Sequence, residues 1–486
     1  MTLAASIPLA AASVVLQSCA GVGGPITGGG GGLPDPTAEF LALLAPEQKD
    51  ATYIGADACR TCHTTLGDHW ADTLHESKGV TCERCHGPGS VHKDAMSGAP
   101  AGPQLATLAV DTHPTNILTF PKVNDPVVCG QCHGPVHDQY NFSQHSKIVV
   151  DPVEEAVLNP ATYGRNSQCV GCHSGLFRTE IIEKGVDPLT LTDAQIVEIA
   201  EDTLKLVPHT ANCSTCHDPH RQTGNLSDNG EEVQLRHKVF NDGSDLSLVD
   251  AGSPPAEFLK FDHTCATCHN GRGTDASDTG LLARTSRPSM HDSNQFQMLM
   301  GFGGSEGSGP VARRTQHAEI PGQCSTCHMP DSRHSFTVSF DKGCSPCHTA
   351  ADAAARADAI KSDILQRLVS LKTKMEAWAQ AKFGDGDLWD YTSLLAAEGK
   401  TAPDQTLVPI EIKRARHNYY FVIRSGDYGV HNAPYAKYLI DYGKAQVDSL
   451  AVATVAPARG MTDAQRLAIT ERDRKRASMA DLEEIR

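Results

Sequence analysis

Cysteine and histidine recur together along this chain at one fixed spacing. Sixteen of its 17 cysteines fall into eight copies of Cys-x-x-Cys-His. The first cysteines of the copies are Cys59, Cys82, Cys129, Cys169, Cys213, Cys265, Cys324 and Cys344. The second cysteines are Cys62, Cys85, Cys132, Cys172, Cys216, Cys268, Cys327 and Cys347. Each second cysteine is followed directly by a histidine, and these are His63, His86, His133, His173, His217, His269, His328 and His348.

This spacing is that of the c-type haem attachment motif. Two thiols three positions apart face the same side of one helical turn and reach the two vinyl groups of one porphyrin. The histidine that follows is placed to ligate the iron from one side. Zinc sites or disulfides are the alternative, but zinc does not require a histidine after every cysteine pair, and a dithiol enzyme needs only one pair. The eight copies therefore predict eight covalently attached haems.

The second axial position of each iron decides whether the site is closed or open to a substrate. The eight motif histidines leave 15 others among the 23 in the chain, and eight would suffice to give every iron two histidines. We therefore expect mostly bis-histidine haems. Methionine is a possible ligand that would raise the reduction potential.

Local sequence around the remaining histidines resembles multihaem cytochromes of the superfamily that contains pentahaem nitrite reductase and hydroxylamine oxidoreductase. The matching stretches are Trp70–His75, Cys82–His92, Phe142–Ser146, Cys216–His220, Gln234–Arg236, His291–Gly301, His334–Phe336, Arg416–Asn418 and Gly429–Asn432. The resemblance covers most of residues 53–450 and is a weak guide to substrate. It implies that the matching histidines are distal haem ligands, namely His75, His92, His145, His220, His291, His317, His334 and His431. His209 is a ninth candidate, and His263 is the next.

The composition leaves little material for an ordinary core. Hydrophobic residues make up 40% of the chain and aromatic residues 5%, against 42 Gly and 28 Pro. Cys59 to His348 spans 290 residues, or about 36 per motif. Porphyrins would supply the missing packing surface, so we expect a mainly α fold with extensive loop and little β, whose apo-chain is unfolded or molten.

The chain beyond His348 has a different character. It contains no cysteine, and Ile360, Leu368, Met375 and Trp378 belong to an apolar pattern of helical period. Asn432 marks the start of another helix, and capping boxes open helices at residues 462–465 and 192–195. The expected organisation is a leader (1–18), a Gly-rich tether (19–50), an eight-haem domain (51–348) and a helical domain (349–486).

The N-terminus resembles a bacterial lipoprotein signal. Residues 3–16 are small and apolar, and Leu16-Gln-Ser-Cys19 follows, which implies cleavage before Cys19 and acylation of its thiol. An ordinary secretory signal is the alternative, and no Lys or Arg precedes the apolar stretch. In either case we expect an exported protein, anchored at the outer membrane or cell surface if it is lipidated and otherwise periplasmic or extracellular.

Two functions are compatible with these features. The first is electron transfer to other redox proteins or extracellular acceptors, with assembly into cytochrome filaments left open and no catalytic residue assigned. The alternative is a periplasmic octahaem reductase or oxidase of a nitrogen or sulfur compound such as nitrite, hydroxylamine or tetrathionate. Such enzymes often carry Lys in place of one motif His, and no motif here does. The formal charge of −16 makes nucleic acid an unlikely partner.

Overall fold

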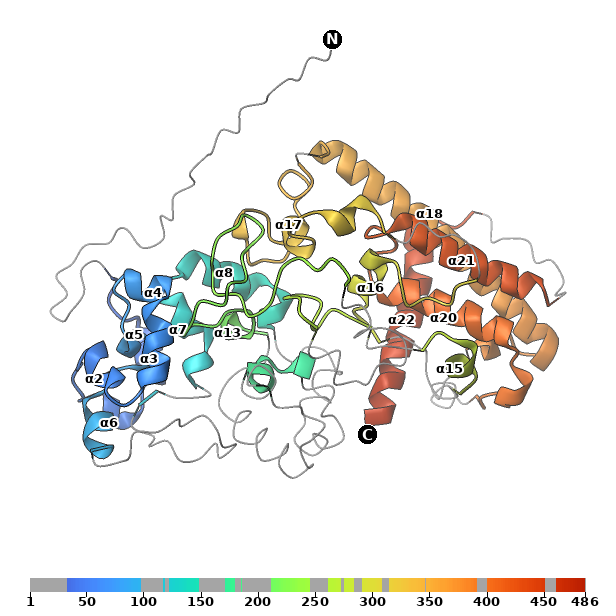
Figure 1. Cartoon of the computed structure of the whole chain (residues 1–486). Coiled ribbons are helices and arrows are strands. Elements are labelled where there is room, and N and C mark those ends of the chain that lie inside the picture. The colour runs from blue at the N-terminus through green and yellow to red at the C-terminus, as the bar shows by residue number, and fades with distance from the viewer. Residues whose placement is uncertain are drawn as a thin grey trace, which may run out of the picture. The chain divides into compact units, whose positions relative to one another are not determined.

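The chain forms short helices joined by long loops, followed by a bundle of longer helices (Figure 1). The computed structural model describes residues 33–97, 117–118, 122–147, 171–179, 185, 211–244, 261–271, 275–283, 291–307, 314–345, 347–390, 400–450 and 460–485. The short helices are α1 (Ala38–Leu43), α2 (Ala56–Arg60), α3 (Thr64–Ala71), α4 (Leu74–Ser77), α5 (Cys82–His86), α6 (Ser90–Ala95), α7 (Pro126–Gly130), α8 (Gly134–Phe142), α11 (Gly175–Phe177), α13 (Cys213–Cys216), α15 (Asp278–Ala283), α16 (Gln295–Met300) and α17 (Cys324–His328). The long helices are α18 (Ala350–Phe383), α20 (Ile410–Arg424), α21 (Ala433–Asp448) and α22 (Asp463–Ile485). In the described parts of the chain there is no strand, only two isolated β-bridges, so the expected mainly α fold is confirmed.

The chain divides into two compact units, Met1–Asp138 and Gln139–Arg486. In the first unit, the buried carboxylate of Glu83 joins the first two motifs. It accepts hydrogen bonds from the backbone N–H groups of Ile54 (2.9 Å), Gly55 (2.8 Å) and Gly89 (2.9 Å). These groups lie just before α2 and just before α6, so one side chain fixes both helices against α5. A buried carboxylate with three donors is well satisfied, which explains a charged residue at a site only 2% exposed.

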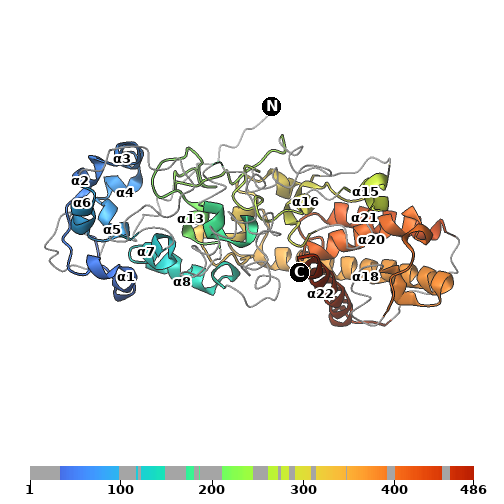
Figure 2. The ribbon, with the colours of Figure 1, turned by 90° about the horizontal axis from the view of Figure 1, so that it is seen from below.

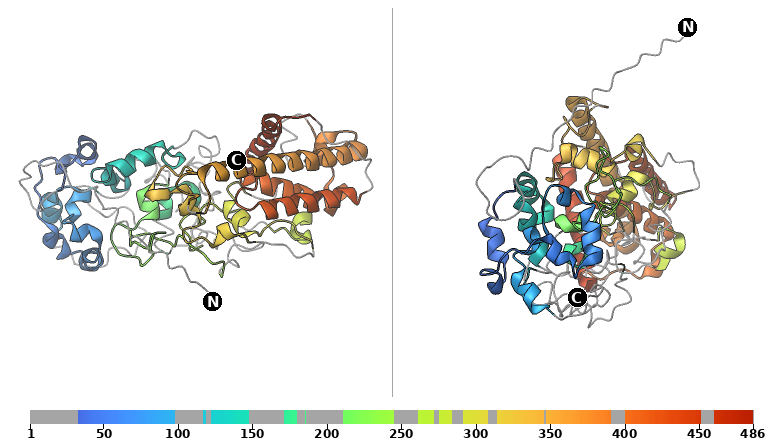
Figure 3. Two further views of the ribbon diagram at one scale, coloured as in Figure 1. Left: turned by 90° about the horizontal axis from the view of Figure 1, so that it is seen from above. Right: turned by 60° about the vertical axis from the view of Figure 1, so that its left-hand side comes forward.

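The helical bundle of the second unit begins directly after the last motif. Thr349 caps α18, because its hydroxyl accepts the N–H of Asp352 at 3.2 Å. Helices α18, α20 and α21 run side by side in contact with one another (Figures 2 and 3). The expected helix starts are confirmed for α21, where the Asn432 side chain accepts the N–H of Tyr435 (3.1 Å), and for α22.

The capping box at the start of α22 is formed in both directions. The N–H of Gln465 donates to Thr462 Oγ1 at 3.3 Å, and the N–H of Thr462 donates to Gln465 Oε1 at 2.8 Å. The similar box expected at residues 192–195 lies outside the described residues.

The bundle also holds a segment of the motif region, residues 291–307. Asn418 on α20 exchanges two hydrogen bonds with the backbone of Ser305, accepting at 2.7 Å and donating at 2.8 Å. The side chain of Asn294 donates to the Phe421 carbonyl at 3.0 Å. Hydrogen bonds between these asparagine side chains and buried backbone groups fix the position of residues 291–307 against α20. The expected boundary between an eight-haem domain (51–348) and a helical domain (349–486) lies within the second unit. This division into two domains stays a prediction.

Apolar side chains gather mainly in the bundle. The largest cluster of buried hydrophobic residues among those described lies on α18, α20 and α21 and their neighbours. Two smaller clusters lie among the motifs, one around Phe40 and Val128 and one around Phe261 and Phe296. This distribution agrees with the expectation that bound groups, and not apolar side chains alone, fill the interior of the motif region. Within the described residues, no helix has the length and apolar character to cross a bilayer.

Candidate haem-binding sites

The motifs that the structure describes in full form a single helical turn or a tight turn of similar shape. The backbone N–H of the motif histidine donates to the carbonyl of the first cysteine at 2.9–3.0 Å in the motifs of His63, His133, His217, His269 and His348. The motifs of His86 and His328 lie within α5 and α17. One helical turn places residues three and four apart on the same side, so the two thiols and the histidine of a motif share a face.

The described motif thiols are reduced and differ in acidity. All the described motif cysteines are free of disulfides, and Cys169 lies outside the described residues. Burial raises the pKa of Cys85 to about 11, that of Cys216 to about 12 and that of Cys327 to about 11. Contact with Cys59 lowers the pKa of Cys82 to about 7, and contact with Cys265 lowers that of Cys324, so the acidity of the thiols does not by itself separate a zinc site from a haem site.

Seven motif histidines each lie opposite a second histidine from elsewhere in the chain. The first unit contains His63–His92 with ring centroids 6.4 Å apart and His133–His75 at 6.2 Å. The second unit contains His173–His291 at 6.1 Å, His217–His334 at 6.2 Å, His269–His145 at 6.0 Å, His328–His431 at 6.2 Å and His348–His317 at 6.5 Å. Every pair joins one motif histidine to one distal candidate, and no histidine occurs twice.

The spacing of these rings matches two imidazoles bound to one iron. A metal–imidazole bond is about 2.0 Å long, and the ring centre lies a further ~1.1 Å behind the nitrogen, so two rings across one metal have centres about 6.2 Å apart. Ordinary aromatic contacts cover a wider range of about 4.5–7 Å. Seven pairs within 6.0–6.5 Å, each made of one motif histidine and one other histidine, therefore fit a metal ion between the two rings.

Hydrogen bonds fix the tautomer of several of these rings. The Nδ1 atoms lie within hydrogen-bond distance of backbone carbonyls for His86 (Leu118, 2.8 Å), His217 (Val233, 2.7 Å), His291 (Asp292, 2.6 Å), His328 (Phe336, 3.1 Å) and His334 (Ser332, 2.9 Å). A carbonyl can only accept, so each Nδ1 carries the proton and each Nε2 keeps a lone pair for a metal. This arrangement is the usual outer shell of a metal-bound histidine.

Some predicted ligands are not placed in a pair. His209 lies outside the described residues. His86 and His220 are described but belong to none of these seven pairs; both make further contacts, and the backbone N–H of His220 is held by Asp218 at 3.1 Å. His263 has another role. Its Nδ1 accepts the N–H groups of Cys265 (3.1 Å) and Ala266 (3.0 Å), so it caps the turn of that motif.

Cysteines of different motifs lie close to one another. Direct side-chain contacts join Cys59 to Cys82 in the first unit, and Cys172 to Cys268 and Cys265 to Cys324 in the second. The ligand atoms of His263, Cys265 and Cys324 all lie within 4.8 Å of one another. Groups attached to these sulfur atoms must therefore be near neighbours.

Sequence reasoning missed the carboxylates behind some of the ligands. Asp427 lies 3.2 Å from Nδ1 of His431, and although burial alone would raise its pKa, His431 holds the pKa of Asp427 at about 2. Asp352 lies 3.5 Å from Nδ1 of His348. Both carboxylates are four residues from their histidine, but Asp427 and His431 lie in the turn after α20 and His348 lies before the start of α18, so no helical pattern in the sequence points to either contact.

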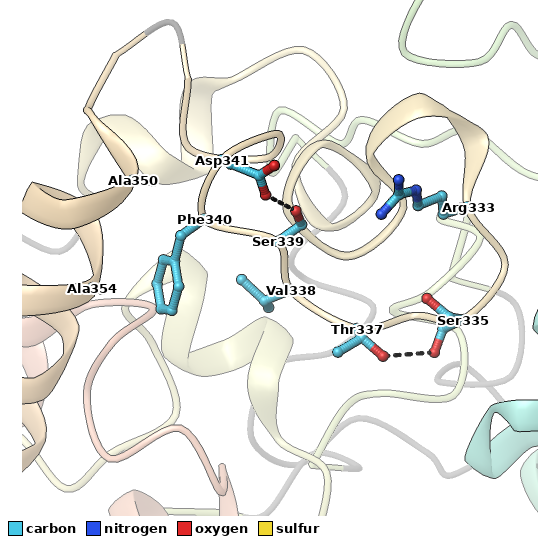
Figure 4. A pocket seen from close by; sticks show the side chains of 9 residues that line it. All are labelled: Arg333, Ser335, Thr337, Val338, Ser339, Phe340, Asp341, Ala350 and Ala354. Atoms are coloured by element: carbon cyan, nitrogen blue, oxygen red, sulfur yellow. Dashed lines mark hydrogen bonds between the residues drawn. The ribbon is translucent and has the colours of Figure 1, made fainter.

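A surface hollow of about 590 Å³ lies between the loop after His334 and the start of α18 (Figure 4). Its lining residues are Arg333, Ser335, Thr337, Val338, Ser339, Phe340, Asp341, Ala350 and Ala354. Ser339 bonds to Asp341, and Thr337 donates to the Ser335 carbonyl at 3.2 Å. The hollow is open to solvent and contains no motif residue, so it offers no enclosed chamber for catalysis.

Comparison with known proteins gives limited guidance. No protein-family model matches the chain, and no curated protein matches it. Among solved structures, the chain is similar to the crystal structure of the outer cell wall cytochrome OcwA, with 17% sequence identity and a TM-score of 0.44. The similarity covers 76% of this chain and 70% of that chain. At this level of similarity the function must be inferred from the residues of this chain.

Proposed function

We propose that this chain is an octahaem c-type cytochrome that carries electrons. The observation that supports this most strongly is the set of seven histidine pairs with ring centres 6.0–6.5 Å apart, each behind a Cys-x-x-Cys turn. The motif and the pair are independent features of the chain, one local in sequence and one tertiary. Both fit the same group at the same place.

The residues present would hold each haem by two kinds of bond. Two cysteines would bind the porphyrin and the motif histidine would ligate the iron, and at the seven paired sites the second histidine would ligate it as well. When bound, haem supplies an iron that alternates between the ferric and ferrous states. The protein contributes fixed spacing, closed axial positions and a surrounding of low dielectric.

Closed axial positions favour a carrier over an enzyme. A catalytic iron must expose one position to its substrate, whereas in seven sites a second imidazole stands where the substrate would bind. Imidazole pairs also hold the iron electron-rich, so we expect mostly negative reduction potentials.

The cysteine contacts support a route for the electrons within each unit. Haems held by Cys59 and by Cys82 would meet at their edges in the first unit. In the second unit, the motif of Cys265 and Cys268 touches two other motifs through Cys324 and Cys172. Cys216 also lies near this motif, since burial and then the nearby Cys268 raise the pKa of Cys216, so the motif of Cys265 and Cys268 would be a branch point with three neighbours.

The location and partners belong to the same proposal. Acylation of Cys19 would anchor the protein at the outer membrane, with the Gly-rich stretch from residue 28 to 32 as a tether. The partners would be other redox proteins, extracellular electron acceptors or further copies of this chain in a filament.

Protein-film voltammetry of the holoprotein tests the carrier against the enzyme. A carrier gives a broad reversible wave that nitrite, hydroxylamine and tetrathionate leave unchanged. A catalytic current with any of these substrates would replace electron transfer by the reductase or oxidase alternative. A protein matured with the c-type haem machinery that contains no haem would exclude both.

A further inference from the structure

We propose that Asp427 is a positioning residue that lowers the reduction potential of the haem held between His328 and His431. The inference rests on the proposed function and concerns one of its eight sites. It assigns a specific task to a carboxylate that is not a ligand.

The fold holds Asp427 against the ring of His431. Its side chain is 7% exposed, and one oxygen lies 3.2 Å from His431 Nδ1 and 2.7 Å from the backbone N–H of the same residue. Ser425 bonds to the other carboxylate oxygen. Each contact comes from the turn between α20 and α21, so the carboxylate has little freedom to move away.

The turn itself is tightly constrained. Tyr428 has a φ of 50° and Gly429 a φ of 83°, which is the left-handed region. A Cβ on Gly429 would lie 3.0 Å from Ile364 on α18 and 3.1 Å from Ala436 on α21. The position of Asp427 is therefore set by the helical bundle and does not depend on the ligand that it contacts.

The physical effect of the carboxylate is to make His431 a stronger electron donor. A negative charge behind the Nδ1–H pulls the proton and leaves more electron density on Nε2, which stabilises ferric over ferrous iron. The carboxylate acts mainly through its charge at 3.2 Å, because the Nδ1 atom has no hydrogen bond of good geometry among the described residues. Low exposure keeps the charge poorly screened.

The other sites of the second unit provide the contrast. His217, His291 and His334 lie against backbone carbonyls, which carry partial charge only. Asp352 lies 3.5 Å from His348, but its side chain is 45% exposed and also bonds to Arg356 at 2.7 Å. Its charge is compensated and hydrated, so Asp352 should have a much smaller effect than Asp427.

A spectroelectrochemical titration of the full holoprotein tests this inference with matched variants. Asp427→Asn keeps the size and the acceptor oxygen but removes the charge. We expect one haem to become at least tenfold easier to reduce at a fixed potential, which is an upward shift of about 59 mV or more for one electron. Asp427→Glu should restore most of the original value, and Asp352→Asn should shift its haem by clearly less.

The outcomes separate this inference from the proposed function. Eight low-spin haems in Asp427→Asn with no shifted potential would overturn the inference and leave the proposed function intact. Loss of one low-spin haem in that variant would overturn it as well, because Asp427 would then hold the turn and not tune the iron. The same shift in a His431→Ala background would show that the charge does not act through His431. A wild-type protein without haem would refute the proposed function itself.

Discussion

Removal of one distal histidine should open one iron and leave the other sites unchanged. His75 is suited to this test, since its ring lies 6.2 Å from that of His133. We expect His75→Ala to convert a single ferric haem from low spin to high spin. The substitution leaves the local backbone intact, because the hydrogen bond from the Val80 N–H reaches the His75 carbonyl and Thr73 still caps the helix.

The size of the effect follows from the number of motifs. With eight haems, the variant should lose about one eighth of its low-spin ferric signal and gain one high-spin haem per molecule. Added imidazole should refill the open position and restore the low-spin state. This rescue excludes unfolding as the cause, because a misfolded site would not rebuild the ligand field.

His69 offers a matched control six residues earlier. It lies exposed on α3 and belongs to none of the seven pairs. His69→Ala should therefore retain the spectrum of the wild type. The assay for both variants is low-temperature EPR with spin quantification on oxidised protein. The reasoning would be refuted if His75→Ala kept every haem low-spin, or if both variants gave the same high-spin signal.

Three further results are expected. Asp473→Ala should destabilise the helical bundle by about 3–5 kcal/mol in chemical unfolding, because it leaves Lys372 buried without its partner at 2.5 Å; a cost below 1 kcal/mol would contradict the buried pair. The His237 and Lys238 side chains bond to Asp262 and hold its pKa well below the usual range. The stability that these bonds contribute should therefore be present at neutral pH and lost as pH falls below about 4. An Asp262→Asn variant whose melting temperature differs from that of the wild type equally at pH 7 and pH 3 would contradict this. The ring planes of four histidine pairs cross at 66–80°, whereas those of one pair lie 18° apart. EPR should therefore resolve strongly anisotropic low-spin haems beside a rhombic one. A single uniform low-spin signal would contradict these ring angles.

Local features of the fold could be predicted from the sequence because their causes are local. The motif cysteines and histidines are fixed by covalent chemistry within five residues. The starts of α21 at Asn432 and of α22 at Thr462 follow from side chains that bond to backbone one turn away. In each case both interacting groups lie within a few residues of one another, so the sequence alone identifies them.

The pairing of the histidines depends on tertiary structure. His145 meets His269 and His328 meets His431, more than 100 residues apart in each case. No spacing rule joins such residues, because their contact depends on how distant segments pack in the fold. The resemblance to known multihaem cytochromes identified most of the partners as candidates but could not say which motif each one faces. Asp427 could not be identified from the sequence, because its contact with His431 depends on the conformation of the turn between α20 and α21.

Low-temperature EPR of the oxidised wild-type holoprotein, with the spins counted, tests the central claim most directly. We expect eight haems per chain, with a low-spin iron at each of the seven paired sites. In an electron carrier the iron of the eighth haem is low-spin as well. A stoichiometric high-spin haem at any of the seven paired sites would contradict the ligand geometry and turn attention to catalysis.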